Sequence, residues 1–162
     1  MRRFILPLVA ACGLTIAYMN PALADDDMTM AGTLEITHAW ARAMLPNQPA
    51  GGGYLDISNT GSEPDRLIGA RSPAAGKVEV HTMEVVNDVM VMRPVEGGLE
   101  IPPDATVKLE PGGLHLMFMA VSDPFDEGET VPVTLEFEHA GPIDIELPVG
   151  SREGGMPGHS GH

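Results

Sequence analysis

The stretch Leu114-His115-Leu116-Met117-Phe118-Met119-Ala120 alternates aliphatic or aromatic residues with histidine and methionine. Successive side chains of a β-strand point to opposite faces, so this period of two predicts a strand. The two leucines and the phenylalanine are then expected to face a core. The histidine and the two methionines share the other face, where their nitrogen and sulfur atoms are available for chemistry.

The same alternation recurs in seven other segments, namely residues 34–36, 54–57, 78–80, 89–95, 107–109, 131–137 and 143–149. Turn-forming residues separate them, as at Asn59-Thr60-Gly61-Ser62 and Pro111-Gly112-Gly113. The pattern predicts an all-β domain of about eight or nine strands, arranged as an antiparallel sandwich or a Greek-key barrel. The only helical turn that we expect lies around residues 72–75.

Composition narrows the class of protein. The chain has 162 residues, 43% of them apolar, which suits one globular domain, and its 19 Gly and 15 Pro disfavour a helical bundle. The formal charge of −14 disfavours nucleic acid as a partner because phosphates would be repelled. We find no Ser-His-Asp order with a supporting motif and no glycine-rich phosphate loop, so no enzymatic activity is expected.

The N-terminus has the features of a signal peptide. Arg2 and Arg3 precede an apolar run over residues 4–18, and Ala22-Leu23-Ala24 gives the small-x-small pattern of a cleavage site. Cys12 lies too close to the N-terminus for a lipoprotein cleavage box, so we expect it to belong to the apolar run. The mature, secreted chain is therefore predicted to begin at Asp25, without cysteine and without a membrane span.

We divide the chain into three predicted segments. Residues 1–24 are expected to be the signal peptide, residues 25–150 a metal-binding β domain and residues 151–162 a flexible tail. Residues 25–32 are also expected to be flexible, since they are polar and poor in branched apolar side chains.

Histidine and methionine recur with a spacing of two in three predicted strands. These residues are His81 and Met83, Met90 and Met92, and His115, Met117 and Met119. Thioether sulfur is a soft, neutral donor that favours Cu(I), and imidazole binds copper and zinc. The set therefore favours monovalent copper, with zinc as the second choice. The alternative is that the methionines pack in the core or form an apolar docking patch.

At these residues the sequence resembles the PCuAC-type periplasmic copper chaperones. Their pattern is a His, about ten residues, a Met, some twenty residues and His-x-Met. Here ten residues separate His81 from Met92 and twenty-two separate Met92 from His115, with Met117 completing the pattern. The resemblance extends over further segments, namely residues 39–43, 53–55, 65–67, 80–83, 111–117 and 134–137 together with Asn59.

The resemblance implies a cupredoxin-like fold in the periplasm and a Cu(I) site formed by His81, Met92, His115 and Met117. It also implies copper delivery to respiratory oxidase assembly, typically to the binuclear centre of cytochrome c oxidase, directly or with a partner thiol-bearing chaperone. The other methionines of the three strands, Met83, Met90 and Met119, are expected to support the site or to act as alternate ligands. Electron transfer is the weaker interpretation, since a blue-copper site needs a cysteine thiolate.

The C-terminal tail carries Met156, His159 and His162 in a glycine-rich context. Short His-bearing tracts bind metal, and some relatives carry such extensions, so we expect either a weaker Cu(II) site or a simple flexible end. His38 and His139 have no such partners and are expected to be surface or structural residues. A secreted interaction module with a Met-rich docking surface is the alternative function.

Overall fold

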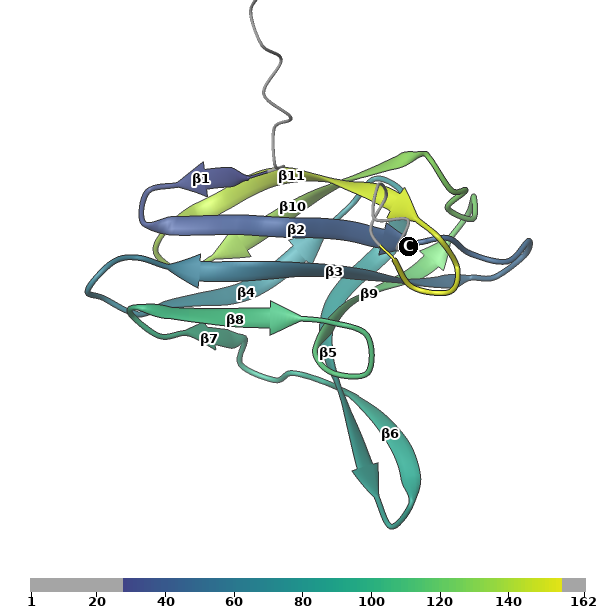
Figure 1. The fold of residues 1–162 in the computed structure, drawn as a ribbon, viewed down its shortest axis with the longest axis horizontal. Coiled ribbons are helices and arrows are strands. Elements are labelled where there is room, and N and C mark those ends of the chain that lie inside the picture. The colour runs from purple at the N-terminus through teal and green to yellow at the C-terminus, as the bar shows by residue number, and fades with distance from the viewer. Residues whose placement is uncertain (1–27, 156–162) are drawn as a thin grey trace, which may run out of the picture.

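The computed structural model describes residues 28–155, and these form eleven β-strands. No helix long and apolar enough to cross a membrane is found in this part of the chain. The strands, labelled in Figure 1, are β1 Thr29–Ala31, β2 Leu34–Arg42, β3 Ala50–Asn59, β4 Asp65–Arg71, β5 Ala75–Val86, β6 Val89–Pro94, β7 Leu99–Ile101, β8 Ala105–Leu109, β9 His115–Val121, β10 Thr130–Phe137 and β11 Gly141–Gly150.

Seven of these strands close into a barrel. The pairing order runs β2-β11-β10-β4-β5-β9-β3, and β3 pairs back with β2 to complete the ring. β11 and β2 are parallel, at Val149 and Gly150, whereas the other neighbours are antiparallel. The remaining strands attach outside the ring, with β1 on β2, β6 on β5, β7 on β4 and β8 on β3.

The barrel interior is filled by the inward faces of the strands. Leu116 and Phe118 of β9 are fully buried, as are Leu135 of β10 and Leu147 of β11. Phe118 approaches β3 so closely that a Cβ on Gly53 would lie 2.9 Å from its ring. Glycine at this position therefore lets the ring pack directly against the backbone of β3.

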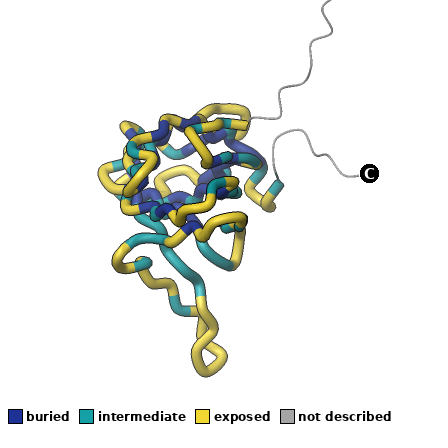
Figure 2. Tube along the Cα trace, turned by 90° about the vertical axis from the view of Figure 1, so that its left-hand side faces the viewer, coloured by how far each residue is buried: buried dark blue, intermediate teal, exposed yellow. Residues whose placement is uncertain are grey.

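The second half of β5 leaves the barrel and forms a hairpin with β6 that projects from the body (Figure 1). Asn87 and Asp88 make its turn, and both have positive φ, 52° and 62°. A two-residue turn with two left-handed residues matches the twist of a hairpin, which explains why Asn and Asp occupy these positions. The hairpin is exposed toward its tip (Figure 2), so it adds little to the core.

The structure corrects several sequence-based expectations. It contains more strands than the predicted eight or nine, because β1, β4 and β7 carry too short or too irregular an apolar pattern. Part of the segment 25–32, expected to be flexible, forms β1 on the edge of β2. The expected helical turn around residues 72–75 is a tight turn closed by Ala75 N–H donating to the Ser72 carbonyl, after which β5 begins.

The end of the described chain also differs from the expectation of a wholly flexible tail. Ser151 and Gly155 form a β-bridge that follows β11 directly. The predicted signal peptide, Cys12 and the tail residues from Met156 to His162 lie outside the described residues.

Candidate metal centre

Two histidines meet where β5 and β9 pair. His81 lies directly opposite His115 in the antiparallel register, although thirty-three residues separate them in the sequence. Their ring centroids are 6.0 Å apart, and the planes are tilted by 53°. Because the partner residues of a register share a face of the sheet, both imidazoles project to the same side.

The thioethers come from three strands around this pair. In the hairpin, Met83 of β5 lies opposite Met92 of β6. In β9, Met117 is two residues after His115 and therefore on the same face, while Leu116 and Phe118 point into the core. The alternation that predicted this division of β9 is confirmed.

A cavity of about 280 Å³ brings most of these side chains together. The predicted metal ligands that line it are Met92, His115 and Met117, together with the predicted supporting residue Met83. His81 adjoins it through the contact with His115. The rest of the lining consists of Arg42, Gln48, Ala50, Gly51, Gly52, Tyr54, Pro111 and Gly112.

Hydrogen bonds leave one nitrogen of each imidazole free. His115 is 5% exposed, and its Nδ1 lies 3.0 Å from the Gly113 carbonyl oxygen. A carbonyl only accepts, so Nδ1 carries the proton and Nε2 keeps its lone pair. In His81 the other ring nitrogen makes the contact, since Nε2 lies 3.1 Å from a carboxylate oxygen of Glu79. His81 Nδ1 is buried and has no hydrogen-bond partner among the described residues.

One wall of the cavity is aromatic and cationic. The guanidinium carbon of Arg42 lies 5.5 Å from the ring centroid of Tyr54, which stacks at 4.6 Å on Trp40. Burial raises the pKa of Tyr54, although Arg42 opposes this effect, so the phenol is neutral at physiological pH. A Cβ on Gly52 would lie 2.8 Å from the Tyr54 hydroxyl oxygen, so this glycine leaves the space that the phenol fills.

The donor set fits a soft monovalent ion. Within residues 28–155 no group of three or more His, Cys, Asp or Glu side chains is arranged to hold a metal. The methionines that line the cavity beside the imidazoles supply thioethers, which suit Cu(I) and not hard cations. Two neutral imidazoles and two thioethers add no negative charge, so the bound ion would keep its single positive charge.

Other candidate residues lie apart from the cavity lining. Met90 lies opposite Val85 near the hairpin tip and is 63% exposed. Met119 lies opposite Lys77 and Ala50, farther along β9. The His38 side chain is 62% exposed and contacts Asp56, and that of His139 is 69% exposed and contacts Asp65, as expected for surface histidines.

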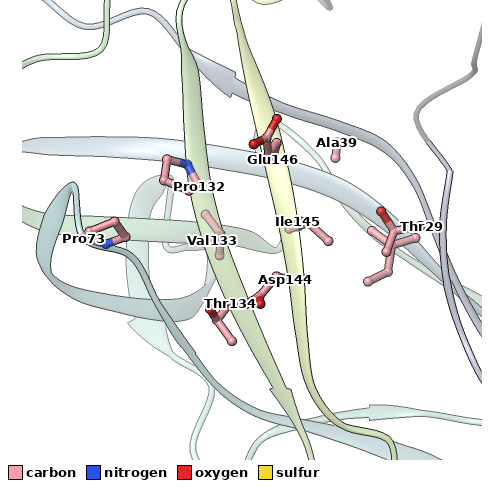
Figure 3. A pocket seen from close by; sticks show the side chains of 10 residues that line it. Thr29, Ala39, Pro73, Pro132, Val133, Thr134, Asp144, Ile145 and Glu146 are labelled. Carbon is pink, nitrogen blue, oxygen red and sulfur yellow. Dashed lines mark hydrogen bonds between the residues drawn. The ribbon is translucent and has the colours of Figure 1, made fainter.

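A larger cavity, of about 440 Å³, lies elsewhere in the barrel wall (Figure 3). Val133 and Ile145 form part of its apolar lining, and Asp144 and Glu146 contribute carboxylates. It contains neither histidine nor methionine. Donor chemistry, and not cavity size, therefore identifies the smaller cavity as the candidate metal centre.

Three residues of the site were not identified as functional from the sequence. Glu79 precedes His81 by two positions, so period two alone would have placed both on one face of β5. Tyr54 and Arg42 fell within segments that carry the resemblance, but their place beside the cavity depends on the pairing of β2, β3 and β9. No local pattern in the sequence gives that pairing.

Comparison with known proteins gives the family. Residues 34–149 match the model of the LpqE-like family, described as "Putative lipoprotein LpqE-like". A relative from Leifsonia xyli subsp. xyli (strain CTCB07), "Putative lipoprotein Lxx21020", is 30% identical over 141 residues. That alignment covers 87% of this chain and 84% of the relative.

Solved structures give the fold. The copper-bound PCuAC domain from PmoF2 matches with a TM-score of 0.65 at 29% identity, over 76% of this chain and 97% of that domain. The solution structure of CuI-DR1885 from Deinococcus radiodurans matches with a TM-score of 0.55 at 28% identity, over 69% of this chain and 74% of the other. The predicted all-β, cupredoxin-like fold is confirmed. The chain belongs to the LpqE-like family and has the fold of the PCuAC copper-binding domains.

Proposed function

We propose that this protein is a periplasmic copper chaperone that binds Cu(I) through His81, Met92, His115 and Met117. The observation that carries the proposal is the meeting of two imidazoles across the β5–β9 pair, beside a cavity lined by thioethers. The copper-bound state of the PmoF2 domain and the CuI state of DR1885 support copper as the ion. Met83 is a candidate alternate ligand because it lies opposite Met92, whereas Met90 and Met119 would need a change in the site to reach the ion.

The geometry suits transfer of the ion better than permanent retention. His115 is nearly buried, whereas Met92 is 43% exposed on the projecting hairpin. A ligand at the exposed side can be replaced by one from an acceptor while the buried imidazole still holds the copper. We therefore propose ligand exchange, with a respiratory cytochrome oxidase subunit or a partner copper chaperone as acceptor.

The tail provides a second, weaker site in this proposal. The described chain ends near the candidate centre, since a Cβ on Gly154 would lie 3.2 Å from a guanidinium nitrogen of Arg42, which lines the cavity. Met156, His159 and His162 follow within seven residues, and an extended chain of that length spans about 23 Å. Copper captured there, including Cu(II), would be held within reach of the core site.

A location outside the cytoplasm is part of the proposal. The family description as a lipoprotein supports a secreted or envelope protein. We propose signal-peptide cleavage before Asp25 and a periplasmic location. Mass spectrometry of the mature N-terminus tests this, because a lipidated Cys12 at the N-terminus would contradict cleavage at Asp25.

The first experiment is an anaerobic Cu(I) titration against a chromophoric chelator. We expect one tight equivalent in the mature chain, its survival after removal of residues 156–162 and its loss in a His115→Ala, Met117→Ala double variant. The matched control is His139→Ala with Met30→Ala, which removes the same residue types from exposed positions away from the cavity. Equal loss in both double variants, or no tight binding by the wild type, would contradict the proposal.

Delivery needs its own test. Copper-loaded protein is mixed anaerobically with the apo form of a purified oxidase subunit domain that holds a binuclear copper centre. We expect copper to appear in the acceptor after the two proteins are separated. Copper that stays with the donor throughout would show that the protein stores the ion and does not deliver it to this acceptor.

The second candidate function is a secreted interaction module without a transfer role. The exposed apolar residues of the hairpin favour it, namely Val85, Val86, Val89, Met90 and Met92. This candidate predicts no tight Cu(I) binding and no effect of copper on partner association. The titration described above therefore separates the two functions.

A further inference from the structure

Glu79 lies directly beside the candidate copper ligands. It is two residues before His81 on the same face of β5 and opposite Met117 of β9. One carboxylate oxygen, Oε2, contacts His81 Nε2 at 3.1 Å, and the other, Oε1, pairs with the Lys77 ammonium. Glu79 therefore connects a surface cation to the imidazole of His81. The His81 side chain is largely buried, with only 12% of its surface exposed.

The carboxylate determines which His81 nitrogen is free. A glutamate carboxylate is ionised at neutral pH and can only accept hydrogen bonds, and here its two oxygens face Lys77 and His81. In the neutral ring the proton then resides on Nε2. The lone pair is left on Nδ1, the buried atom without a hydrogen-bond partner among the described residues.

We propose that Glu79 is a positioning residue that holds His81 in the Nε2–H tautomer and keeps Nδ1 available for Cu(I). This inference rests on the proposed copper site. Metal-binding histidines are commonly oriented by a carboxylate or carbonyl on the other ring nitrogen. Here His81 uses a carboxylate and presents Nδ1, whereas His115 uses the Gly113 carbonyl and presents Nε2.

Lys77 completes the arrangement. A lone carboxylate beside the ligands would add a negative charge to a site built from neutral donors. The ion pair with Lys77 offsets that charge, so Glu79 contributes mainly orientation. Lys77 is largely exposed, with 64% of its side chain accessible, and the pair can therefore form without burying a charge.

The first readout does not require copper. Nitrogen-15 NMR of histidine-labelled apo protein at neutral pH distinguishes protonated from unprotonated ring nitrogens. We expect the Nε2–H tautomer for His81 in the wild type and a mixture of tautomers in Glu79→Ala. In Glu79→Gln the single amide oxygen can accept from His81 Nε2–H, but the Lys77 ammonium competes for it, so we expect only partial recovery of the wild-type tautomer. His115 serves as an internal control for folding, because its bond to Gly113 does not involve Glu79.

The second readout is Cu(I) affinity by chelator competition. Loss of such an orienting partner typically weakens metal binding about 10-fold to 100-fold, which is the change we expect for Glu79→Ala. Glu79→Gln should recover only part of the affinity, because its one accepting oxygen is shared between Lys77 and His81. The matched control is Glu84→Ala, which removes the same charge from an exposed position farther along the same strand, on the face opposite His81, and should leave the affinity unchanged.

The outcomes separate this inference from the proposed function. The role of Glu79 would be overturned if the wild-type His81 carried its proton on Nδ1, or if Glu79→Ala changed neither the tautomer nor the affinity. If the His115→Ala, Met117→Ala variant still loses copper in that case, the proposed copper site stands. Absence of Cu(I) binding by the wild type would overturn both.

Discussion

The two faces of β9 can be compared residue by residue. Leu116 and Phe118 have no exposed surface and fill the barrel, whereas Met117 and Met119 on the opposite face are only half-buried. His115 is nearly buried but keeps a polar contact to Gly113. One strand therefore supplies both core packing and candidate ligands. Substitutions on the core face should affect folding, and those on the other face should affect copper binding.

The largest effect on folding is expected from Phe118→Ala. Its ring packs edge-on against Phe125 at 5.2 Å and closely against Gly53, so truncation leaves a cavity that the backbone of β3 cannot fill. We expect a loss of about 3 to 5 kcal/mol in the free energy of unfolding, measured by chemical denaturation. Where the variant remains folded, Cu(I) affinity should stay near the wild-type value. A specific loss of copper binding without a loss of stability would contradict the division between the two faces.

A smaller loss of stability is expected for Asp65→Asn. Asp65 is 8% exposed and accepts hydrogen bonds from the backbone N–H groups of Arg66, His139 and Ala140, which fix β4 beside the β10–β11 turn. An amide has one accepting oxygen and no charge, so we expect a loss of about 2 kcal/mol at pH 7. Glu138→Gln is the control, since its 52% exposed side chain makes only a surface ion pair.

The difference in stability between the wild type and Asp65→Asn should depend on pH, and the direction of the pKa shift of Asp65 gives its sign. Burial alone would raise the pKa of Asp65, but the backbone donors of His139, Arg66 and Ala140 outweigh it and lower the pKa. Its stabilising contribution is therefore complete above the ordinary carboxyl value of about 4 and is lost as the pH falls through the lower, folded value. The difference between wild type and Asp65→Asn should shrink below about pH 4, and a difference that grows there would contradict the assignment.

On the other face of β9, Met117→Leu separates packing from ligation. Leucine has a similar volume but no sulfur, so we expect a stability change below about 1.5 kcal/mol. Cu(I) affinity should fall about tenfold or more, because one soft donor is lost. Met44→Leu is the control, since Met44 is a buried methionine outside the cavity lining, 4% exposed. Unchanged copper affinity in Met117→Leu would return Met117 to a packing role.

These two faces also show how far the sequence could predict the structure. Alternation along β9 was enough to assign Leu116 and Phe118 to the core and His115 to the opposite face, because the period is a local property of an extended chain. The all-β class followed from the same signal. β4 escaped prediction because Gly69 and Arg71 interrupt its apolar pattern, and β1 and β7 have only three residues each.

No local sequence pattern could predict that the two histidines meet at one site. His81 and His115 meet through a pairing of strands that are distant in the sequence, and spacing alone cannot specify such a register. Spacing supplied the candidate histidines and methionines, and resemblance to a family narrowed them to four, but neither indicated Glu79. The hydrogen bond from His81 to Glu79 requires the side-chain geometry, although their spacing of two already placed them on one face.

The smallest effects are expected at the hairpin, and they test what its exposed apolar surface is for. Val85 and Val89 are 68% and 60% exposed, so a Val85→Ser, Val89→Ser variant should change stability by less than about 1 kcal/mol. Neither residue has a donor for copper, so the affinity in chelator competition should match the wild type. If the hairpin receives an acceptor protein, the rate of copper transfer should nevertheless fall, because the acceptor must approach Met92 along this surface. If the variant transfers copper at the wild-type rate, the role of the hairpin is confined to carrying Met83 and Met92. If its copper affinity is reduced, the hairpin shapes the site itself.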